Sequence, residues 1–311
     1  MNLSTFDAFK RLSPPAGAII LEGETLRRYQ QELLKIADDI VEVCESEGIT
    51  WHLTGGSALG AVRHQGIIPW DDDVDFDILG SDFDRFVKAF REKHGDTYWV
   101  NTCQTPGYGI LTYSVRLKNS VFRSKDDFGR EDAGFRVDIN RIENTFDNAL
   151  LRYAHGFLCM GTGFLLSCRN FYEKRKGLLS LVQQDQALRR IFMIKIILGA
   201  PLSFLSLTKW AILTQKCYAL CRNERSVYVS VPAGRKHYFG EMYRRADFVE
   251  SVEMPFEGRH WRIPKDYDGY LRNMYGDYMR IPAEAERETH VLLELQFPNE
   301  QETKLCQHTE E

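Results

Sequence analysis

The chain has 311 residues, of which 43% are hydrophobic and 27% are charged. This composition is typical of a soluble globular protein of one large or two modest domains, and it excludes a disordered chain and a fibrous repeat. The net charge of −4 gives no general reason to expect a nucleic acid as partner. The charge is unevenly distributed, however. Residues 148–225 hold twelve Lys and Arg but three Asp and Glu, a net charge of +9, which leaves −13 for the rest.

The cysteines and apolar segments indicate the compartment. Seven scattered cysteines without a CxxC pair favour free thiols in a reducing cytosol and argue against a zinc site. The first fifteen residues contain no apolar stretch long enough for a signal peptide, so we expect a cytoplasmic protein. Residues 191–213 are long enough to cross a bilayer, but Lys195, Pro201 and Lys209 disfavour a membrane span.

The hydrophobic patterning predicts an α/β fold. Gly48 is placed to end the first helix, and Ser81 to cap the third. The expected elements in chain order are a helix over 29–48, a strand over 49–53, a short helix over 57–66, a strand over 74–79, a helix over 81–95, and strands over 98–103, 110–117 and 135–140.

Composition divides the chain into four parts. We expect a catalytic core over 25–147, a basic and apolar helical insertion over 148–225, a C-terminal part over 226–298 that completes the site, and a polar tail over 299–311. Frequent Pro and Gly predict that the third part is rich in loops with short elements.

Five aspartates lie within seven positions: Asp71, Asp72, Asp73, Asp75 and Asp77. On a strand, the last three would share one face, with neighbours about 6–7 Å apart. Such repulsion favours a hard divalent cation, magnesium or manganese in its place. A solvated acidic loop is the alternative, although apolar residues on both sides place the acids beside a buried strand. Asp71 is expected to be a cap or supporting group, and Asp77 to be the member that could face solvent.

A second strand supplies another acid, Asp138, within an apolar pattern. A site with two metal ions needs carboxylates from more than one strand, which favours Asp138 as a third ligand or as a general base. The alternative is a strand-end residue paired with Arg136 or Arg141.

Phosphate-binding groups are predicted at the junction of the first strand, over 49–53, and the short helix over 57–66. Gly55, Gly56 and Ser57 would offer backbone N–H groups at a helix N-terminus. Arg63 could reach the same anion with its guanidinium fork. A glycine pair followed at this distance by a strand bearing DxD is the pattern of the polymerase-β-like nucleotidyltransferases.

Three motifs carry a resemblance to a known family: GGSALGAVRHQGIIPWDDDVDFDIL at 55–79, FRVDI at 135–139, and PFEGRHWRIPKDYDGYLRNMYGDYMRIP at 255–282. In these motifs and their order the chain resembles the LicD-like phosphotransferases, which include bacterial phosphocholine transferases and are related to the fukutin-related proteins of animals.

The resemblance implies transfer of a substituted phosphate, such as phosphocholine, phosphoethanolamine or an alditol phosphate, from a CDP-activated donor to a sugar hydroxyl. The acceptor would be a cell-surface glycan of a capsule, lipopolysaccharide or teichoic acid, and CMP would be released. By motif, Asp73 and Asp75 would be metal ligands, Asp138 the third carboxylate, and Arg63 a donor-phosphate contact. The run VDINRIENTFD after Asp138 is more polar than in many relatives, so the donor group could differ.

The aromatic C-terminal motif offers further contacts. Within the resemblance, Asp277 and the tyrosines of this motif would meet the donor or the acceptor, with the rings stacking on cytosine or enclosing a quaternary ammonium; these tyrosines are Tyr267, Tyr270, Tyr275 and Tyr278. Trp70, beside the acids, could likewise be a ligand platform or a packing anchor. Core packing is the alternative for these rings. We interpret the histidines as structural; they include His64, His237 and His290.

The insertion and the reaction class each leave a choice open. Residues 148–225 have the composition of helices that rest on anionic lipid at the inner face of the plasma membrane or hold a lipid-linked glycan. They could equally form a helical subdomain that packs internally or dimerises. The alternative function is a nucleotidyltransferase that modifies RNA or protein and releases pyrophosphate.

Overall fold

The computed structural model describes residues 19–124, 127, 130–182, 185–287 and 292–298. It has a mixed α/β architecture, as the patterning predicted, built on a sheet with the strand order β1-β2-β6-β4-β3. β7 extends the sheet from the far end of β6 and pairs with β8. The strands of this sheet are β1 (Trp51–Leu53), β2 (Asp75–Leu79), β3 (Tyr98–Asn101), β4 (Tyr113–Leu117), β6 (Arg136–Asn144), β7 (Tyr228–Ser230) and β8 (Met242–Arg244).

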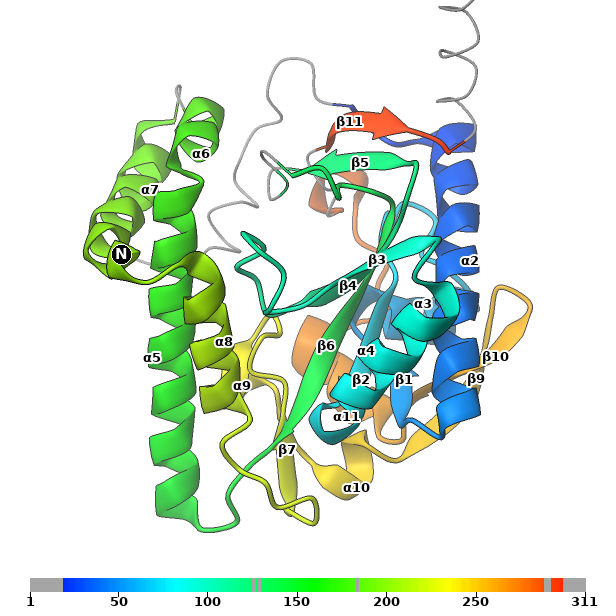
Figure 1. Ribbon diagram of the computed structural model, residues 1–311. Helices are drawn as coiled ribbons and strands as arrows, with labels where there is room; N and C mark the ends of the chain where they lie inside the picture. The colour runs from blue at the N-terminus through cyan, green and yellow to red at the C-terminus, as the bar shows by residue number, and fades with distance from the viewer. Residues whose placement is uncertain (1–18, 125–126, 128–129, 183–184, 288–291, 299–311) are drawn as a thin grey trace, which may run out of the picture.

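β2 and β6 are parallel neighbours in this sheet, whereas its other pairings are antiparallel. Figure 1 shows the helices α2 and α4 beside the sheet and the helices of the insertion standing apart on the other side. The helices before the insertion are α2 (Gly23–Glu47), α3 (Gly55–His64) and α4 (Gly80–His94).

One face of the sheet is apolar and is covered by α2 and α4. On β2 and β6 this face carries Phe76, Ile78, Val137 and Ile139, all buried. The alternation of side chains along a strand places every second residue on the opposite face. The opposite face is therefore the one that carries the acids of both strands.

Cross-strand register aligns polar residues in a row on that second face. Asp75 is paired with Asp138, Asp138 with Ser114, and Ser114 with Asn101. Residues directly opposite one another in a sheet point to the same side. The row thus runs across four strands, from the acidic motif to the edge strand β3.

The insertion is helical, as predicted. Its elements are α5 (Ala149–Glu173), α6 (Arg175–Leu181), α7 (Gln186–Gly199), the 3₁₀ turn η1 (Ala200–Phe204) and α8 (Leu207–Tyr218). The apolar segment 191–213 is not a straight helix, because the chain bends by 94° between η1 and α8. A helix that is long and apolar enough to cross a membrane is instead found at α5, which the patterning did not single out.

The insertion joins the body of the protein through α5 and α8. Tyr113 of β4 donates its hydroxyl proton to Gln215 of α8 at 2.8 Å, and Gln215 in turn donates to Glu143 of β6 at 2.7 Å. Cys159, Trp210 and Tyr218 belong to the main hydrophobic core. The far end, where α5 meets α6 and α7, has a small core of its own around Phe171 and Phe192.

The C-terminal part consists of short elements, as predicted. Its elements are α9 (His237–Gly240), α10 (Arg245–Phe248), the hairpin of β9 (Ser251–Phe256) and β10 (Arg259–Pro264), α11 (Tyr267–Tyr275), η2 (Glu284–Glu286), and β11 (Leu292–Gln296), which pairs with β5 (Val121–Ser124). α11 contacts α3, and β10 contacts β1. The end of the chain is thereby brought back to the glycine junction.

Several local predictions need correction. Gly48 does end α2 in a left-handed conformation, but α3 ends at His64 and its left-handed C-cap is Gln65, not Gly66. α4 begins at Gly80 without a side-chain cap, so Ser81 is not its N-cap. Strand β5 was not predicted, and β6 continues to Asn144, beyond the predicted end at 140. The polar tail 299–311 lies outside the described residues.

Candidate functional site

Two acids of neighbouring parallel strands form the centre of the site. Asp75 opens β2, Asp138 lies in β6, and the two are register partners. Both side chains are half-buried. Asp138 also lies 3.4 Å from the Nε of Arg136, so the ion pair that was the alternative for this residue is present. The ion pair and a ligand role are compatible, because a carboxylate has two oxygens.

The loop before β2 adds three more carboxylates. Asp71, Asp72 and Asp73 each offer an oxygen, and these oxygens lie within 4.8 Å of one another. Asp71, predicted to be a cap or supporting residue, is thus as close to the group as its neighbours. The arrangement is one that a single cation could bridge.

Electrostatics show that the acids repel one another. Burial and the charge of Asp73 raise the pKa of Asp71 well above its ordinary value. Burial, followed by the charges of Asp73 and Asp138, does the same to the pKa of Asp75. Carboxylates that are this hard to ionise together are stabilised when a proton or a metal ion joins them.

The glycine pair makes room for these acids. Gly55 has a φ of +54°, which favours glycine, and a Cβ there would lie 3.2 Å from an oxygen of Asp75. A Cβ at Gly56 would lie 2.7 Å from an oxygen of Asp71. The acids therefore sit against the N-terminus of α3, where the partial positive charge of the helix favours them.

The N–H groups at this junction are partly used within the protein. The N–H of Gly55 donates to the hydroxyl of Tyr270 at 2.8 Å, and that hydroxyl shares a hydrogen bond of 2.7 Å with Thr54. The Ser57 hydroxyl accepts from the N–H of Asp75 at 2.9 Å. Thr54 was not predicted as a site residue, whereas Tyr270 belongs to the aromatic set that was expected to contact the donor or acceptor or to pack the core.

Gln30 is another supporting residue that sequence reasoning missed. It lies buried on α2 and donates from Nε2 to the carbonyl of Asp71 at 2.9 Å. The signal was available in principle, because Gln30 is a polar residue beside Tyr29 on the apolar face of an amphipathic helix. It fixes the start of the acidic loop.

Arg63 and Trp70 lie together beside the loop. The guanidinium of Arg63 donates to the carbonyls of Tyr278 and Arg280, at 2.8 and 3.2 Å, and thereby ties α3 to the C-terminal motif. Arg63 lies 5.8 Å and Arg287 4.2 Å from the centroid of the Trp70 ring. The ring of Trp70 thus already holds a cation.

Of the predicted contacts in the C-terminal motif, Tyr275 lies near the acids and Asp277 does not take part in the buried site. Tyr275 is close to the acids, since a Cβ on Gly55 would lie 3.8 Å from its hydroxyl. Burial and the charge of Asp75 raise the pKa of Tyr275. Asp277 is exposed in the turn that follows α11. His290 lies outside the described residues.

Asp77 does not face solvent, contrary to the prediction that it could. It is fully buried on the second face of β2, opposite His52 of β1 and Asn140 of β6. Burial, and then the charge of Glu241, raises its pKa to about 8. Strand alternation correctly placed it on the face of Asp75, but β8, α10 and α11 cover that end of the sheet with Tyr243, Phe248 and Tyr270.

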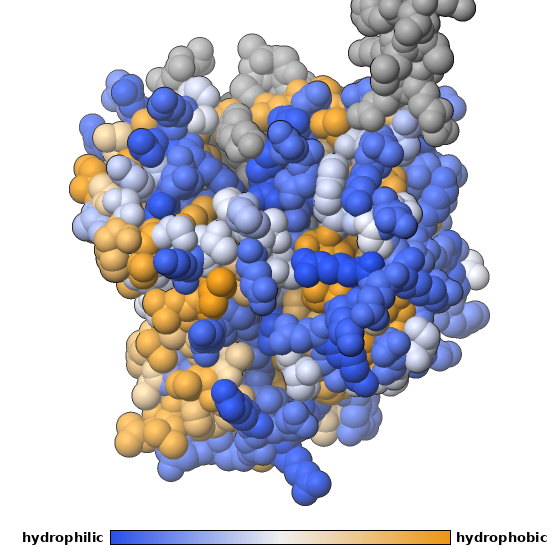
Figure 2. All heavy atoms as spheres, in the orientation of Figure 1, coloured by the Kyte–Doolittle hydropathy of each residue, from blue (hydrophilic) through white to orange (hydrophobic). Residues whose placement is uncertain are grey.

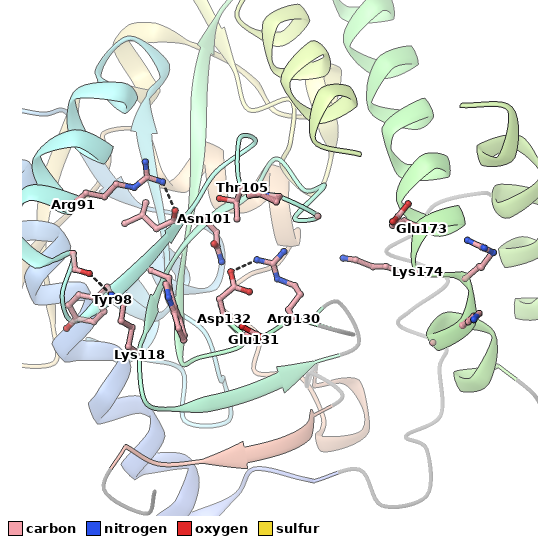
Figure 3. A pocket seen from close by; sticks show the side chains of 18 residues that line it. Arg91, Tyr98, Asn101, Thr105, Lys118, Arg130, Glu131, Asp132, Glu173 and Lys174 are labelled. Carbon is pink, nitrogen blue, oxygen red and sulfur yellow. Dashed lines mark hydrogen bonds and ion pairs between the residues drawn. The ribbon is translucent and has the colours of Figure 1, made fainter. Parts of the chain in front are cut away.

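A wide cleft of about 1240 Å³ opens at the edge strand β3, at the other end of the polar row. Figure 3 shows Arg130 and Asp132 paired on the wall formed by the core, and Glu173 and Lys174 on the wall formed by the insertion. The Tyr108 hydroxyl contacts Ser114 of the polar row, and Arg130 covers the Tyr108 ring at 4.8 Å. The described residues that line this cleft include none of the acids of the site.

Comparison with known proteins supports the resemblance seen in the motifs. Residues 48–138 match the sequence family described as "LicD/FKTN/FKRP, nucleotidyltransferase domain". This range contains the glycine junction, the acidic loop, β2 and Asp138, and it therefore contains the site built above. Residues 48–138 are thus similar to the nucleotidyltransferase domain of this family.

The individual relatives agree with this similarity. The chain is 25% identical over 272 residues to the lipopolysaccharide cholinephosphotransferase LicD of Haemophilus influenzae. The aligned region covers 87% of this chain and 97% of that protein. It is also 50% identical over 50 residues to the ribitol 5-phosphate transferase FKRP of Homo sapiens. This shorter alignment covers 16% of this chain and 10% of that protein. The likeness to the bacterial protein thus extends beyond the matched domain.

Proposed function

We propose that this protein is a metal-dependent transferase with a polymerase-β-like nucleotidyltransferase core. It would move phosphocholine or a related substituted phosphate from a CDP-linked donor to a sugar hydroxyl of a glycan. The observation that carries the proposal is the pairing of Asp75 with Asp138 on adjacent parallel strands, beside the oxygens of Asp71, Asp72 and Asp73. The bacterial relative matched over nearly its whole length is named a cholinephosphotransferase, which favours this reaction over nucleotide transfer to RNA or protein.

Asp73, Asp75 and Asp138 would hold the cation, magnesium or manganese. The fit rests on the raised pKa of Asp75, which marks a carboxylate that ionises at a cost in free energy unless a positive charge joins it. When bound, the ion neutralises charge on the donor's phosphates. Carboxylate oxygens are the ligands that these hard cations take.

The chain's own residues supply orientation and proton transfer. Asp138, held beside Arg136, would accept the proton of the acceptor hydroxyl. A new bond forms between the acceptor oxygen and the phosphorus of the transferred group, and the bond from that phosphorus to the oxygen of CMP breaks. CMP leaves as the anion. The Tyr270 hydroxyl, bonded to Thr54 and Gly55, would keep the glycine junction in place during this exchange.

The aromatic residues bear on the choice of donor. Because Arg287 already covers the ring of Trp70, a quaternary ammonium would have to displace a guanidinium to use that ring. Tyr275 lies beside Gly55, and burial and the charge of Asp75 raise its pKa. We therefore propose Tyr275 rather than Trp70 as the donor contact.

The test is CMP release with magnesium and a glycan acceptor, comparing CDP-choline, CDP-glycerol, CDP-ribitol and CDP-ethanolamine. One donor should give CMP and raise the melting temperature of the protein, and Asp73→Ala should abolish both effects. Near-normal CMP release by Asp73→Ala would refute the metal assignment. Release of pyrophosphate from a nucleoside triphosphate, with no CMP from any of the four donors, would point to nucleotide transfer instead.

The proposal places the protein in the cytoplasm, where CDP-linked donors are made. A lipid-linked glycan acceptor would bring it to the inner face of the plasma membrane. Cell fractionation with and without a salt wash distinguishes a peripheral enzyme from one free in the cytoplasm.

A further inference from the structure

The insertion leaves an apolar stripe uncovered along its longest helix. The stripe consists of exposed side chains of α5 at helical spacing, which are Leu150, Tyr153, Phe157, Met160 and Phe164. At 3.6 residues per turn they fall within an arc of about 80° and extend over about 21 Å. Leu150 is 78% and Phe157 69% exposed. Such a stripe on a soluble helix normally faces a core.

The opposite side of α5 is the one that packs on the body of the protein. Cys159 is buried there, and the ring of His155 contacts Tyr238. A Cβ on Gly156 would lie 2.3 Å from the ring of Phe239, so that this helix is seated closely. The same ring lies 5.9 Å from the ring of Tyr153 and 5.4 Å from that of Phe157, and leaves these two side chains of the stripe 56% and 69% exposed. The stripe is therefore not a core surface that has been turned outward by a loose helix.

The uncovered surface continues onto the neighbouring elements. Of the seventeen large apolar side chains that are exposed in the described residues, thirteen lie between 150 and 220. They include Ile197 of α7, and Phe204 of η1 is 73% exposed. Figure 2 shows these apolar residues gathered along the side of the molecule that α5 and α7 form. An exposed patch of this extent marks an interaction surface.

The positive charge of the insertion indicates which partner the apolar surface binds. Segment 148–225 has a net charge of +9, and exposed cations of the same segment include Arg190, Lys209, Lys216 and Arg222. A second copy of the chain would bring two such segments together, whereas an anionic lipid surface would attract them. We propose that the α5 stripe and its continuation onto α7 and η1 dock on an anionic lipid bilayer, with α5 lying in the plane of the interface.

The fold favours docking over spanning. α5 is long and apolar enough to cross a bilayer. Its other side, however, is held by α8 and α9, and the insertion is attached to β6 before it and to β7 after it. A span would pull His155 and Gly156 away from Tyr238 and Phe239. An interfacial helix keeps those contacts and buries the stripe alone.

The test is flotation of the full-length protein with vesicles of phosphatidylcholine, alone or with phosphatidylglycerol at about a third of the lipid. The wild-type protein should float with the acidic vesicles, and less with the neutral ones. The double variant Leu150→Gln/Phe157→Gln should reduce the bound fraction about tenfold or more. Ile20→Gln, which changes a similarly exposed residue outside the insertion, should float like the wild type.

The outcomes separate this proposal from the proposed reaction, because binding is measured without donor or acceptor. Unchanged melting of the double variant would show that it is folded. Failure of the wild type to float with acidic vesicles would overturn the proposal, as would flotation of the double variant at the wild-type level. A wild-type dimer in solution that the double variant converts to a monomer would assign the stripe to a second copy instead.

Discussion

The acidic site and the insertion differ in which kind of side chain is exposed to solvent. In the site, groups that prefer water are partly buried: Asp71 and Asp75 are crowded against the N-terminus of α3 at a cost in ionisation. In the insertion, groups that avoid water are exposed along α5. Each region is unfavourable for the protein alone. Each would become favourable with the partner proposed for it, a cation in one case and an anionic lipid surface in the other.

If the acidic site and the α5 stripe act independently, a substitution in one region should leave the activity of the other unchanged. Asp75→Asn removes a carboxylate next to Asp138 and should lower the transfer rate by about a thousandfold or more. The same variant should melt a few degrees higher in metal-free buffer, because a neutral amide relieves the repulsion. Vesicle flotation should not change. The matched control is Asp96→Asn, which changes an exposed acid outside the site but within residues 25–147. Equal losses of transfer rate in the two variants would contradict the assignment.

The comparison is sharpened by a residue that supports the site without touching the acids. Tyr270→Phe leaves the Gly55 N–H and the Thr54 hydroxyl without their shared partner. We expect a loss of about 1–3 kcal/mol in the free energy of unfolding, measured by urea denaturation, and a tenfold slower transfer. Tyr267→Phe, on the same helix but only half-buried, should change either quantity much less. Loss of stability with full activity would show that the glycine junction needs no support.

The smallest expected effect concerns pH. Burial raises the pKa of Glu241 to about 7, above its value in the unfolded chain. An acid whose pKa is raised by folding destabilises the protein as pH rises, so the stability should fall between about pH 5 and pH 8. Glu241→Gln should flatten this fall in a series of thermal melts. A stability that rises over this range in the wild type would contradict the assignment.

Much of the site was predictable because its parts are local in sequence. The DxD strand, the glycine junction and the acid in FRVDI all lie within the range matched to the family. The supporting contacts were not predictable, since Gln30 reaches Asp71 across 41 positions and Tyr270 reaches Gly55 across 215. Such contacts depend on how distant segments pack, which periodicity does not report.

The burial of Asp77 and the exposure of the α5 stripe show the same limit of sequence patterns, which do not report what covers a given face. Alternation gives the face on which Asp77 lies, but not that Tyr243 and Phe248 cover that face. Helical spacing gives the faces of α5, but not which one remains open. The amphipathic pattern of a helix is identical whether its apolar side meets a core, a lipid or another chain.

The place where the insertion leaves and rejoins the sheet has a consequence for how such a protein can vary. Glu143 and Asn144, at the end of β6, are register partners of Ser230 and Val229 in β7. The long excursion between them therefore starts and finishes at one point, like a loop on a hairpin. Its length and surface can diverge between related chains while the strand order, and Asp138 at the opposite end of β6, stay as they are. The same sheet could in this way carry insertions with different outer surfaces.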